Sequence, residues 1–168
     1  TTWNTTRKNI FNWRDAEPGS YEKKVKAFFE QIKFLRTLKD YILFLRKNDE
    51  LVKVILRQHQ TRAVEKTLTR VAESGKTRGL IWHTQGSGKT LTMITVASKL
   101  LRDTNGNDKP TVLMLVDRNE LEEKTFNDLT GYGITNVKVA NSKKELEEAL
   151  SSDYRGLILS MIHKFDEI

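Results

Sequence analysis

The sequence predicts an α/β fold, with a parallel sheet flanked by helices and preceded by a helical leader. From position 79 onward, short apolar runs alternate with longer amphipathic stretches, the pattern of parallel strands joined by crossover helices. Before position 51, apolar residues recur mainly at the spacing of one helix face. We therefore expect two parts: residues 1–50 as a mostly helical leader or linker after an upstream domain, and residues 51–168 as the α/β part.

The leader is expected to be helical over residues 20–46, where the pair Asn48-Asp49 ends the pattern. A second helix is expected from about residue 58 to residue 73. Gly75 is a suitable stop, because glycine tolerates the left-handed backbone that often ends a helix. The apolar positions that support the first helix are Val25, Phe28, Phe29, Ile32, Leu35 and Leu38.

Strands are expected in the α/β part at residues 79–83, 111–116, 136–140 and 156–160. Two of the intervening helices carry N-terminal signals, because Asn119 with Glu122 and Ser142 with Glu145 have the spacing of a capping box. The first crossover helix is expected to begin inside the glycine-rich segment that follows the first strand.

The composition is that of a soluble globular protein, with 38% hydrophobic and 30% charged residues. No apolar run approaches the roughly 20 residues of a membrane-spanning helix, and residues 1–10 lack the apolar stretch of a signal peptide. The chain has no cysteine, which excludes disulfides and thiolate metal sites. The lack of cysteine and of a signal peptide leads us to expect a cytoplasmic protein. We also expect a fragment of a longer protein, because the chain begins with Thr1 and ends one turn beyond a strand-like run.

The charge of the chain suits a partner with a phosphate backbone. Lys and Arg number 29 against 22 Asp and Glu, which gives a formal net charge of +7. Charge by itself is a weak indicator, because many basic domains bind no nucleic acid.

The segment at residues 83–90, with the sequence HTQGSGKT, carries the clearest chemical signal. It follows an expected strand and opens an expected helix, the context of a phosphate-binding loop. Small residues let the backbone N–H groups converge on phosphates at the positive end of the helix dipole. Lys89 can then reach the β and γ phosphates of a nucleotide, and the Thr90 hydroxyl can bind Mg²⁺, which prefers oxygen ligands. The predicted loop residues are Thr84, Gln85, Gly86, Ser87, Gly88, Lys89 and Thr90.

One position departs from the usual loop pattern, because His83 stands where the first glycine is expected. The remaining pattern, G-x-G-K-[ST], could be an ordinary glycine turn. Its placement between an expected strand and an expected helix favours the phosphate loop.

The neighbours of this loop resemble the motor subunits of type I restriction enzymes, which are helicase-like proteins of superfamily 2. Residues 81–92, IWHTQGSGKTLT, are similar to motif I of that family, where histidine commonly replaces the first glycine. Residues 57–64, RQHQTRAV, resemble its adenine-reading segment, and the resemblance implies that the carboxamide of Gln60 hydrogen-bonds the base of ATP. The implied fold is the start of a RecA-like P-loop NTPase lobe over residues 51–168.

Two further segments resemble family motifs that touch the DNA backbone. Residues 116–121 are similar to motif Ia and residues 160–165 to motif Ib, which implies DNA contacts from Arg118, Ser160 and Lys164. Serine at position 160 departs slightly from the commoner threonine but keeps a hydroxyl. The resemblance implies ATP and Mg²⁺ as cofactors. It also implies double-stranded DNA and the methyltransferase and specificity subunits of a restriction complex as partners.

Simpler interpretations exist for several of these residues. Gln60 could be a solvated surface residue of its helix, Arg118 could only pair with Glu122 across one helical turn, and Lys164 could simply be solvated. His59 and His163 show no metal-ligand spacing, so we predict no metal site apart from the Mg²⁺ at Thr90.

A complete motor also needs a strand that ends in Asp-Glu, to hold Mg²⁺ and orient the attacking water. Asp166-Glu167 has these letters but no apolar strand leading directly to it, so we expect the chain to stop before this motif and the fragment alone to hydrolyse ATP poorly. Two rival functions stay open. One is a small-molecule phosphoryl transferase with Asp117 at its metal site, and the other is a non-catalytic DNA-binding scaffold, which intact Lys89 and Thr90 disfavour.

Overall fold

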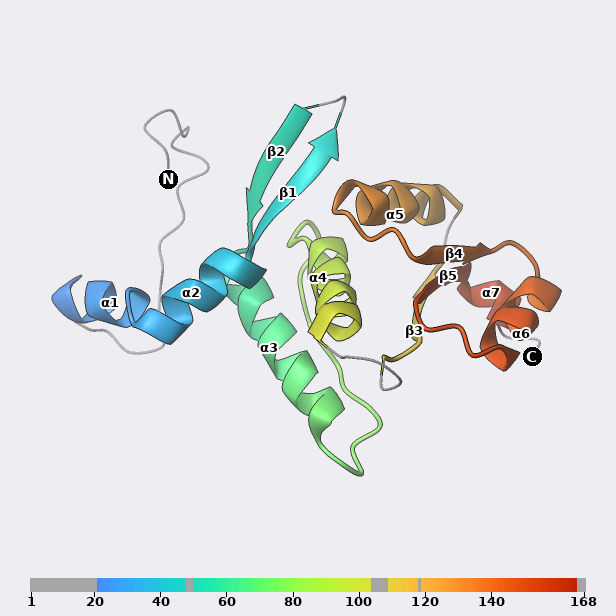
Figure 1. Ribbon diagram of the computed structural model, residues 1–168, viewed down its shortest axis with the longest axis horizontal. Coiled ribbons are helices and arrows are strands. Elements are labelled where there is room, and N and C mark those ends of the chain that lie inside the picture. Colours follow the sequence, from blue (N-terminus) through green and yellow to red (C-terminus); the bar gives the residue numbers. More distant parts are fainter. Residues whose placement is uncertain (1–20, 48–49, 104–108, 118, 166–168) are drawn as a thin grey trace. The chain divides into compact units, whose positions relative to one another are not determined.

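The structure, a computed structural model, describes residues 21–47, 50–103, 109–117 and 119–165 (Figure 1). The chain divides into two compact units, Thr1–Lys39 and Asp40–Ile168. This division falls earlier than the predicted limit at residue 50, because strands on both sides of that position pair with each other. Residues 1–20 at the start of the predicted leader lie outside the described residues.

The first unit contains helix α1, Tyr21–Phe28, and most of helix α2, Gln31–Asp40. The predicted helical stretch over residues 20–46 is therefore interrupted after Phe28. The Glu30 carboxylate caps α2, since Oε1 accepts from the N–H of Ile32 at 3.2 Å and Oε2 from that of Lys33 at 3.0 Å. A carboxylate is favourable there because the start of a helix carries unpaired N–H groups and a partial positive charge.

The second unit begins with a β-hairpin, where the sequence predicted helix up to residue 46. Strand β1, Ile42–Lys47, pairs antiparallel with strand β2, Glu50–Ile55, from Ile42 opposite Ile55 to Lys47 opposite Glu50. The prediction was wrong because the short apolar run at residues 42–45 has no period of its own. The β-branched residues of β2 give that run a strand partner.

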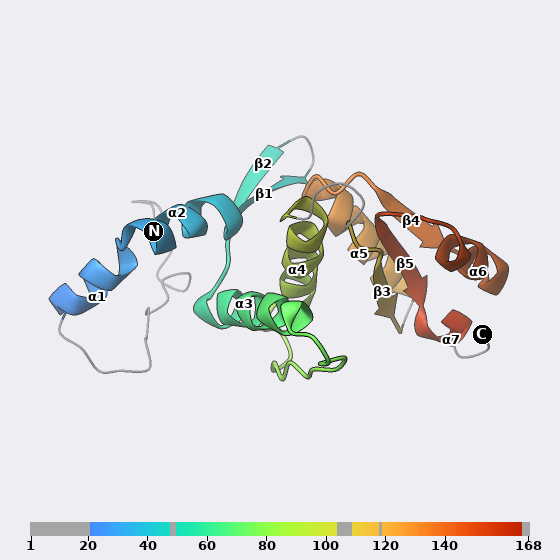
Figure 2. The ribbon, with the colours of Figure 1, turned by 60° about the horizontal axis from the view of Figure 1, so that its bottom comes forward.

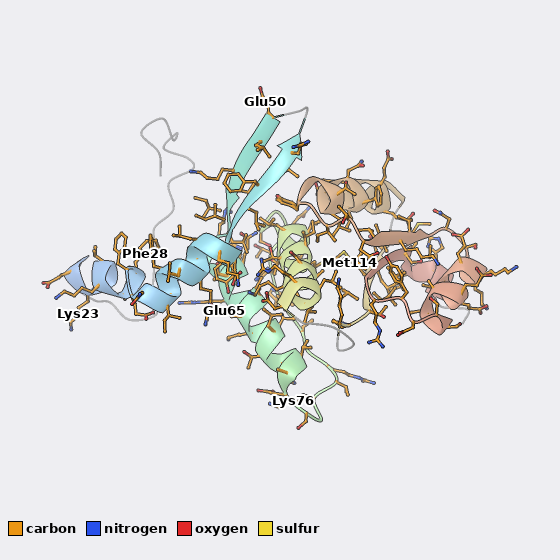
Figure 3. The ribbon with its side chains drawn as sticks, in the orientation of Figure 1. Lys23, Phe28, Glu50, Glu65, Lys76 and Met114 are labelled. Carbon is orange, nitrogen blue, oxygen red and sulfur yellow. The ribbon has the colours of Figure 1, made fainter. Side chains whose placement is uncertain are left out.

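A parallel sheet of three strands forms the centre of the second unit (Figure 1). Strands β3, Val112–Val116, β4, Val137–Ala140, and β5, Leu157–Met161, lie in the order β3-β5-β4. These strands confirm the predictions at residues 111–116, 136–140 and 156–160. Met114, labelled in Figure 3, is the buried central residue of β3. All five residues of β5 are buried, as expected of a central parallel strand.

Helices cover both faces of this sheet. Helices α4, Lys89–Asp103, and α5, Asn119–Gly131, belong to one apolar cluster with Leu157 and Leu159 of β5. Helix α6, Lys143–Ser151, packs on the alternate residue Ile158 in a second cluster. Successive side chains of a strand point to opposite faces, so β5 contributes to both clusters. The last helix is α7, Ile162–Phe165.

The predicted capping of α6 is found in part. The hydroxyl of Ser142 accepts from the N–H of Glu145 at 3.2 Å, while the Glu145 carboxylate accepts from the N–H of Asn141 at 2.8 Å rather than from that of Ser142. The side chain of Asn119, at the other predicted capping box, lies outside the described residues. Helix α3, Gln58–Ala72, confirms the predicted helix over residues 58–73.

The strand predicted at residues 79–83 is absent, since no strand of the described residues pairs with this segment. Its apolar side chains are instead exposed, with Leu80 at 87% and Trp82 at 85%. The prediction was wrong in this structure because an apolar run forms a strand only when a neighbouring strand accepts and donates its backbone hydrogen bonds. The phosphate-loop segment is therefore reached by irregular chain rather than by a strand.

A partly buried ion network fixes helix α4 to Asp40, the last residue of α2. Asp40, 6% exposed, accepts from Lys99 Nζ and from Arg102 Nη2, both at 2.6 Å. Asp103 completes the network, 3.1 Å from Lys99 Nζ and 3.0 Å from Arg102 Nε. Burial disfavours the charged form of Asp103, but the hydrogen bonds from Arg102 and Lys99 outweigh it and hold its pKa below the ordinary value.

Helix α4 lies between α3 and the parallel sheet (Figures 1 and 2). Val64 of α3 forms an apolar cluster with Tyr41 and Leu56 at the base of the hairpin, and Leu91 and Val96 of α4 pack against it. The start of α3 and the start of α4 are thereby held against each other, which positions the glycine-rich segment that opens α4.

Candidate phosphate-binding site

The glycine-rich segment ends directly at the first residue of α4, Lys89, as the sequence predicted. Gly86 and Gly88 have φ angles of 74° and 81°, in the left-handed region that other residues adopt only with strain. The Ser87 N–H and hydroxyl both contact the Thr84 carbonyl, at 3.3 and 2.7 Å. The segment is thus a tight turn whose end coincides with the positive end of a helix of 15 residues.

The first turn of α3 contacts this loop through Gln60, which is only 3% exposed. Its Nε2 donates to the carbonyls of Ser87 and Gly88 at 3.2 and 3.1 Å, and its Oε1 accepts from the N–H of Arg57 at 2.8 Å. Gln60 is therefore not a solvated surface residue in this structure. A side chain at position 88 would bring its Cβ to 2.3 Å from Gln60 Nε2 and would therefore displace the Gln60 carboxamide, while the φ of 81° favours glycine at this position by itself.

Lys89 turns its ammonium group back onto the loop. Its Nζ donates to the carbonyl of Thr84 at 3.0 Å and to that of His83 at 3.4 Å, and the side chain is exposed. These exposed contacts with neutral carbonyls are weaker than bonds to a charged phosphate oxygen. The ammonium can therefore exchange them for phosphate without leaving the loop. Gln85 is exposed in the same turn, and Thr90 is half-buried in the first turn of α4.

His83, which replaces the usual glycine, has its ring 5.1 Å from the ring of His59 at an interplanar angle of 84°. This edge-to-face arrangement is favourable between aromatic rings. His59 also contacts the Ser87 carbonyl through Nε2 at 3.0 Å. Among the described residues, the buried Nδ1 of His83 has no hydrogen-bond partner. From the sequence, His59 was considered only as a possible metal ligand, and its contact with the loop was not predicted although His59 is next to Gln60.

Of the three residues predicted to contact DNA, only Ser160 has a described side chain. Arg118 lies outside the described residues, and Lys164 is in α7 with its side chain outside them. Ser160 is fully buried, and its hydroxyl donates to the Ala140 carbonyl at 3.3 Å. In this structure the hydroxyl is therefore not accessible to DNA, and the DNA contact of Ser160 stays a prediction.

The described residues contain neither a cluster of metal ligands nor a membrane-spanning helix. No group of three or more His, Cys, Asp or Glu within these ranges is arranged to hold a metal ion. Across the same ranges, no helix combines the length and apolar character needed to span a membrane. The pair Asp166-Glu167 lies outside the described residues.

Comparison with known proteins gives one family match and a set of relatives. The family model described as SWI2/SNF2 ATPase matches residues 59–168. The type I restriction enzyme MjaVIIIP endonuclease subunit of Methanocaldococcus jannaschii is 31% identical over 183 residues, which cover 95% of the chain and 17% of the relative. The type I restriction enzyme SsaAORF53P endonuclease subunit of Staphylococcus saprophyticus is 27% identical, covering 96% of the chain and 17% of the relative.

A solved structure, of the ATP-dependent Type ISP restriction-modification enzyme LlaBIII bound to DNA, matches 68% of the chain and 9% of that protein. Its TM-score is 0.49 and its sequence identity is 21%. The chain thus spans 17% of the length of the two curated relatives and less of this one.

Proposed function

Because the chain belongs to the SWI2/SNF2 ATPase family, we propose that it forms part of the ATP-dependent DNA translocase and endonuclease subunit of a type I restriction enzyme. The observation that carries the proposal is the loop at the start of α4, whose two left-handed glycines and helix N-terminus suit a bound phosphate. The curated relatives, which are endonuclease subunits of such enzymes, support the choice of this class of motor.

In this proposal the chain's own residues hold the triphosphate of ATP. The backbone N–H groups of residues 86–90 face the phosphates, and Lys89 neutralises charge on the β and γ phosphates. Thr90, in the first turn of α4, would bind Mg²⁺ through its hydroxyl, an oxygen ligand of the kind that this ion prefers. Bound Mg²⁺ supplies further charge neutralisation at the phosphates.

The proposed partners are double-stranded DNA and the methyltransferase and specificity subunits of a restriction complex. The formal net charge of +7 supports a partner with a phosphate backbone. Target recognition by a separate subunit means that this subunit needs only to hold DNA, without reading its bases.

Replacing Gln60 by alanine is expected to weaken ATP binding more than GTP binding. The carboxamide offers a donor and an acceptor, which match N7 and the 6-amino group of adenine, while guanine presents a carbonyl in place of that amino group. Both Nε2 hydrogens contact loop carbonyls in this structure, so reading adenine requires one of these contacts to exchange for the base. Equilibrium binding of ATP and GTP to the full-length protein measures the difference.

Gln60→Glu is the matched control for this prediction, because it keeps the oxygen that accepts from Arg57 and removes both donors. Loss of the preference for ATP in both variants supports adenine recognition. If Gln60→Ala loses equal affinity for the two nucleotides, adenine recognition by Gln60 is contradicted.

Loss of Arg118 or Lys164 is expected to weaken DNA binding about equally on every sequence. If each side chain neutralises one backbone phosphate, each alanine variant should reduce the slope of log affinity against log salt by about 0.9 for duplex DNA. A salt titration of duplex binding by the full-length protein and the two variants measures the slopes. Unchanged slopes would leave Arg118 as a helix-surface ion pair and Lys164 as solvated charge.

A further inference from the structure

We propose that His59 is a positioning residue of the phosphate loop, which acts with Gln60 to hold the Ser87 carbonyl against α3. This inference rests on the proposed function, because it concerns how the loop is prepared for phosphate. It differs from base recognition, since its effect is the same for any ligand that carries a di- or triphosphate.

Two neighbouring side chains of α3 converge on the same acceptor. His59 Nε2 lies 3.0 Å and Gln60 Nε2 lies 3.2 Å from the Ser87 carbonyl oxygen. A carbonyl oxygen only accepts hydrogen bonds, so the contact requires a proton on Nε2 of His59. The carbonyl of the following residue, Gly88, is held as well, by Gln60 at 3.1 Å and by the N–H of Thr92 at 3.2 Å.

Fixing these carbonyls also fixes the direction of the next N–H groups. In a trans peptide the C=O and the N–H point in opposite directions, and the chain has no cis peptide bond among the described residues. Drawing the Ser87 carbonyl toward α3 therefore aims the Gly88 N–H away from α3. By the same geometry, the bonds to the Gly88 carbonyl aim the Lys89 N–H away from them. These two N–H groups belong to the set that binds phosphate in the proposed function.

His59 contacts both ends of the loop. Besides Ser87 near the end of the loop, it packs edge-to-face on His83 at its start, with ring centroids 5.1 Å apart. One exposed imidazole thus restrains two residues that are four positions apart in the sequence. This pairing gives a physical role to the histidine that replaces glycine at position 83, because a glycine there would have no ring for His59 to contact.

A free loop would have to order its backbone when phosphate binds, and that ordering opposes binding. A loop already held by His59 and Gln60 loses less conformational freedom on binding. His59→Ala is therefore expected to lower the affinity for ATP, GTP and pyrophosphate by about fivefold each, the usual effect of one intramolecular hydrogen bond. Isothermal titration of the full-length protein with the three ligands measures the losses.

Two further variants separate the donor from the ring. His59→Gln restores a side-chain N–H donor and should recover most of the lost affinity, whereas His59→Phe keeps a ring against His83 but has no donor and should stay weak. Thr69→Ala, at an exposed position of the same helix, is the matched control and should bind like the parent.

The outcomes separate this inference from the proposed function. Parent-like binding of all three ligands by His59→Ala would overturn the positioning role and leave the ATP site intact. A loss confined to ATP would also overturn it, because it would make His59 a base contact. A parent that binds neither ATP nor pyrophosphate would overturn both the inference and the proposed function.

Discussion

Replacing Lys89 by alanine is expected to abolish ATP-driven DNA translocation and, with it, ATP-dependent DNA cleavage by the full-length protein. The ammonium group is the loop's only charged side chain, and the proposed role places it against the β and γ phosphates, where charge develops as the terminal phosphate leaves. Removing such a group typically lowers the rate about 100-fold or more. The measurement is cleavage of target-bearing DNA in the presence of ATP.

The control for this prediction is Lys138→Ala, which removes an exposed lysine from β4 and leaves the loop unchanged. It causes the same change in net charge, so it separates the local role of Lys89 from the general basic charge of the chain. Retained ATP-dependent cleavage by Lys89→Ala would contradict the proposed motor.

Among the ion pairs of the described residues, the one whose loss should destabilise the protein most is that of Asp40, and Asp40→Ala is expected to lower the free energy of unfolding by about 3 kcal/mol. Asp40 is 6% exposed and holds Lys99 and Arg102, so its removal leaves two cations without their buried carboxylate. The loss should stay near the lower end of the usual range because Asp103 still contacts both cations. The thermal unfolding midpoint of the second unit within the full-length protein measures this effect.

Asp153→Ala is the matched control, because it breaks an exposed ion pair with Arg155 in which the Asp153 side chain is 82% exposed. Exposed pairs contribute roughly 0–1 kcal/mol, so the midpoint should hardly move. If the two variants have equal effects, the Asp40 network does not anchor α4.

The spacing of apolar residues correctly predicted the helices and strands in which that spacing is regular over several residues. Helix α3 has 15 residues with a clear apolar face, and β5 is an apolar run in a regular alternation of strands and helices. The hairpin was missed because the run at residues 42–45 is apolar on every side, and only its pairing with β2 makes it a strand. The strand predicted at residues 79–83 is absent for the converse reason, since the described sheet gives it no partner.

In the candidate phosphate-binding site, too, sequence pattern predicted the features formed by neighbouring residues and missed those formed by residues far apart in the sequence. The turn from Gly86 to Lys89 could be predicted because its residues are neighbours in the sequence and their conformational needs are local. The spacing of Gln60 to the loop indicated a role for it, but not that its carboxamide binds loop carbonyls. The Asp40 network could not be predicted from local pattern, because Asp40 lies 59 and 62 positions from its partners Lys99 and Arg102.

The rate of ATP hydrolysis with and without double-stranded DNA tests most directly whether this chain carries the ATP site of a DNA motor. The measurement uses the full-length protein, with the methyltransferase and specificity subunits that we propose as its partners, and compares the parent with Lys89→Ala. We expect the hydrolysis rate of the parent to rise strongly when duplex DNA is added, and Lys89→Ala to show no hydrolysis in either condition. Hydrolysis by the parent at the same rate with and without DNA, or an equal rate in the variant, would contradict this expectation.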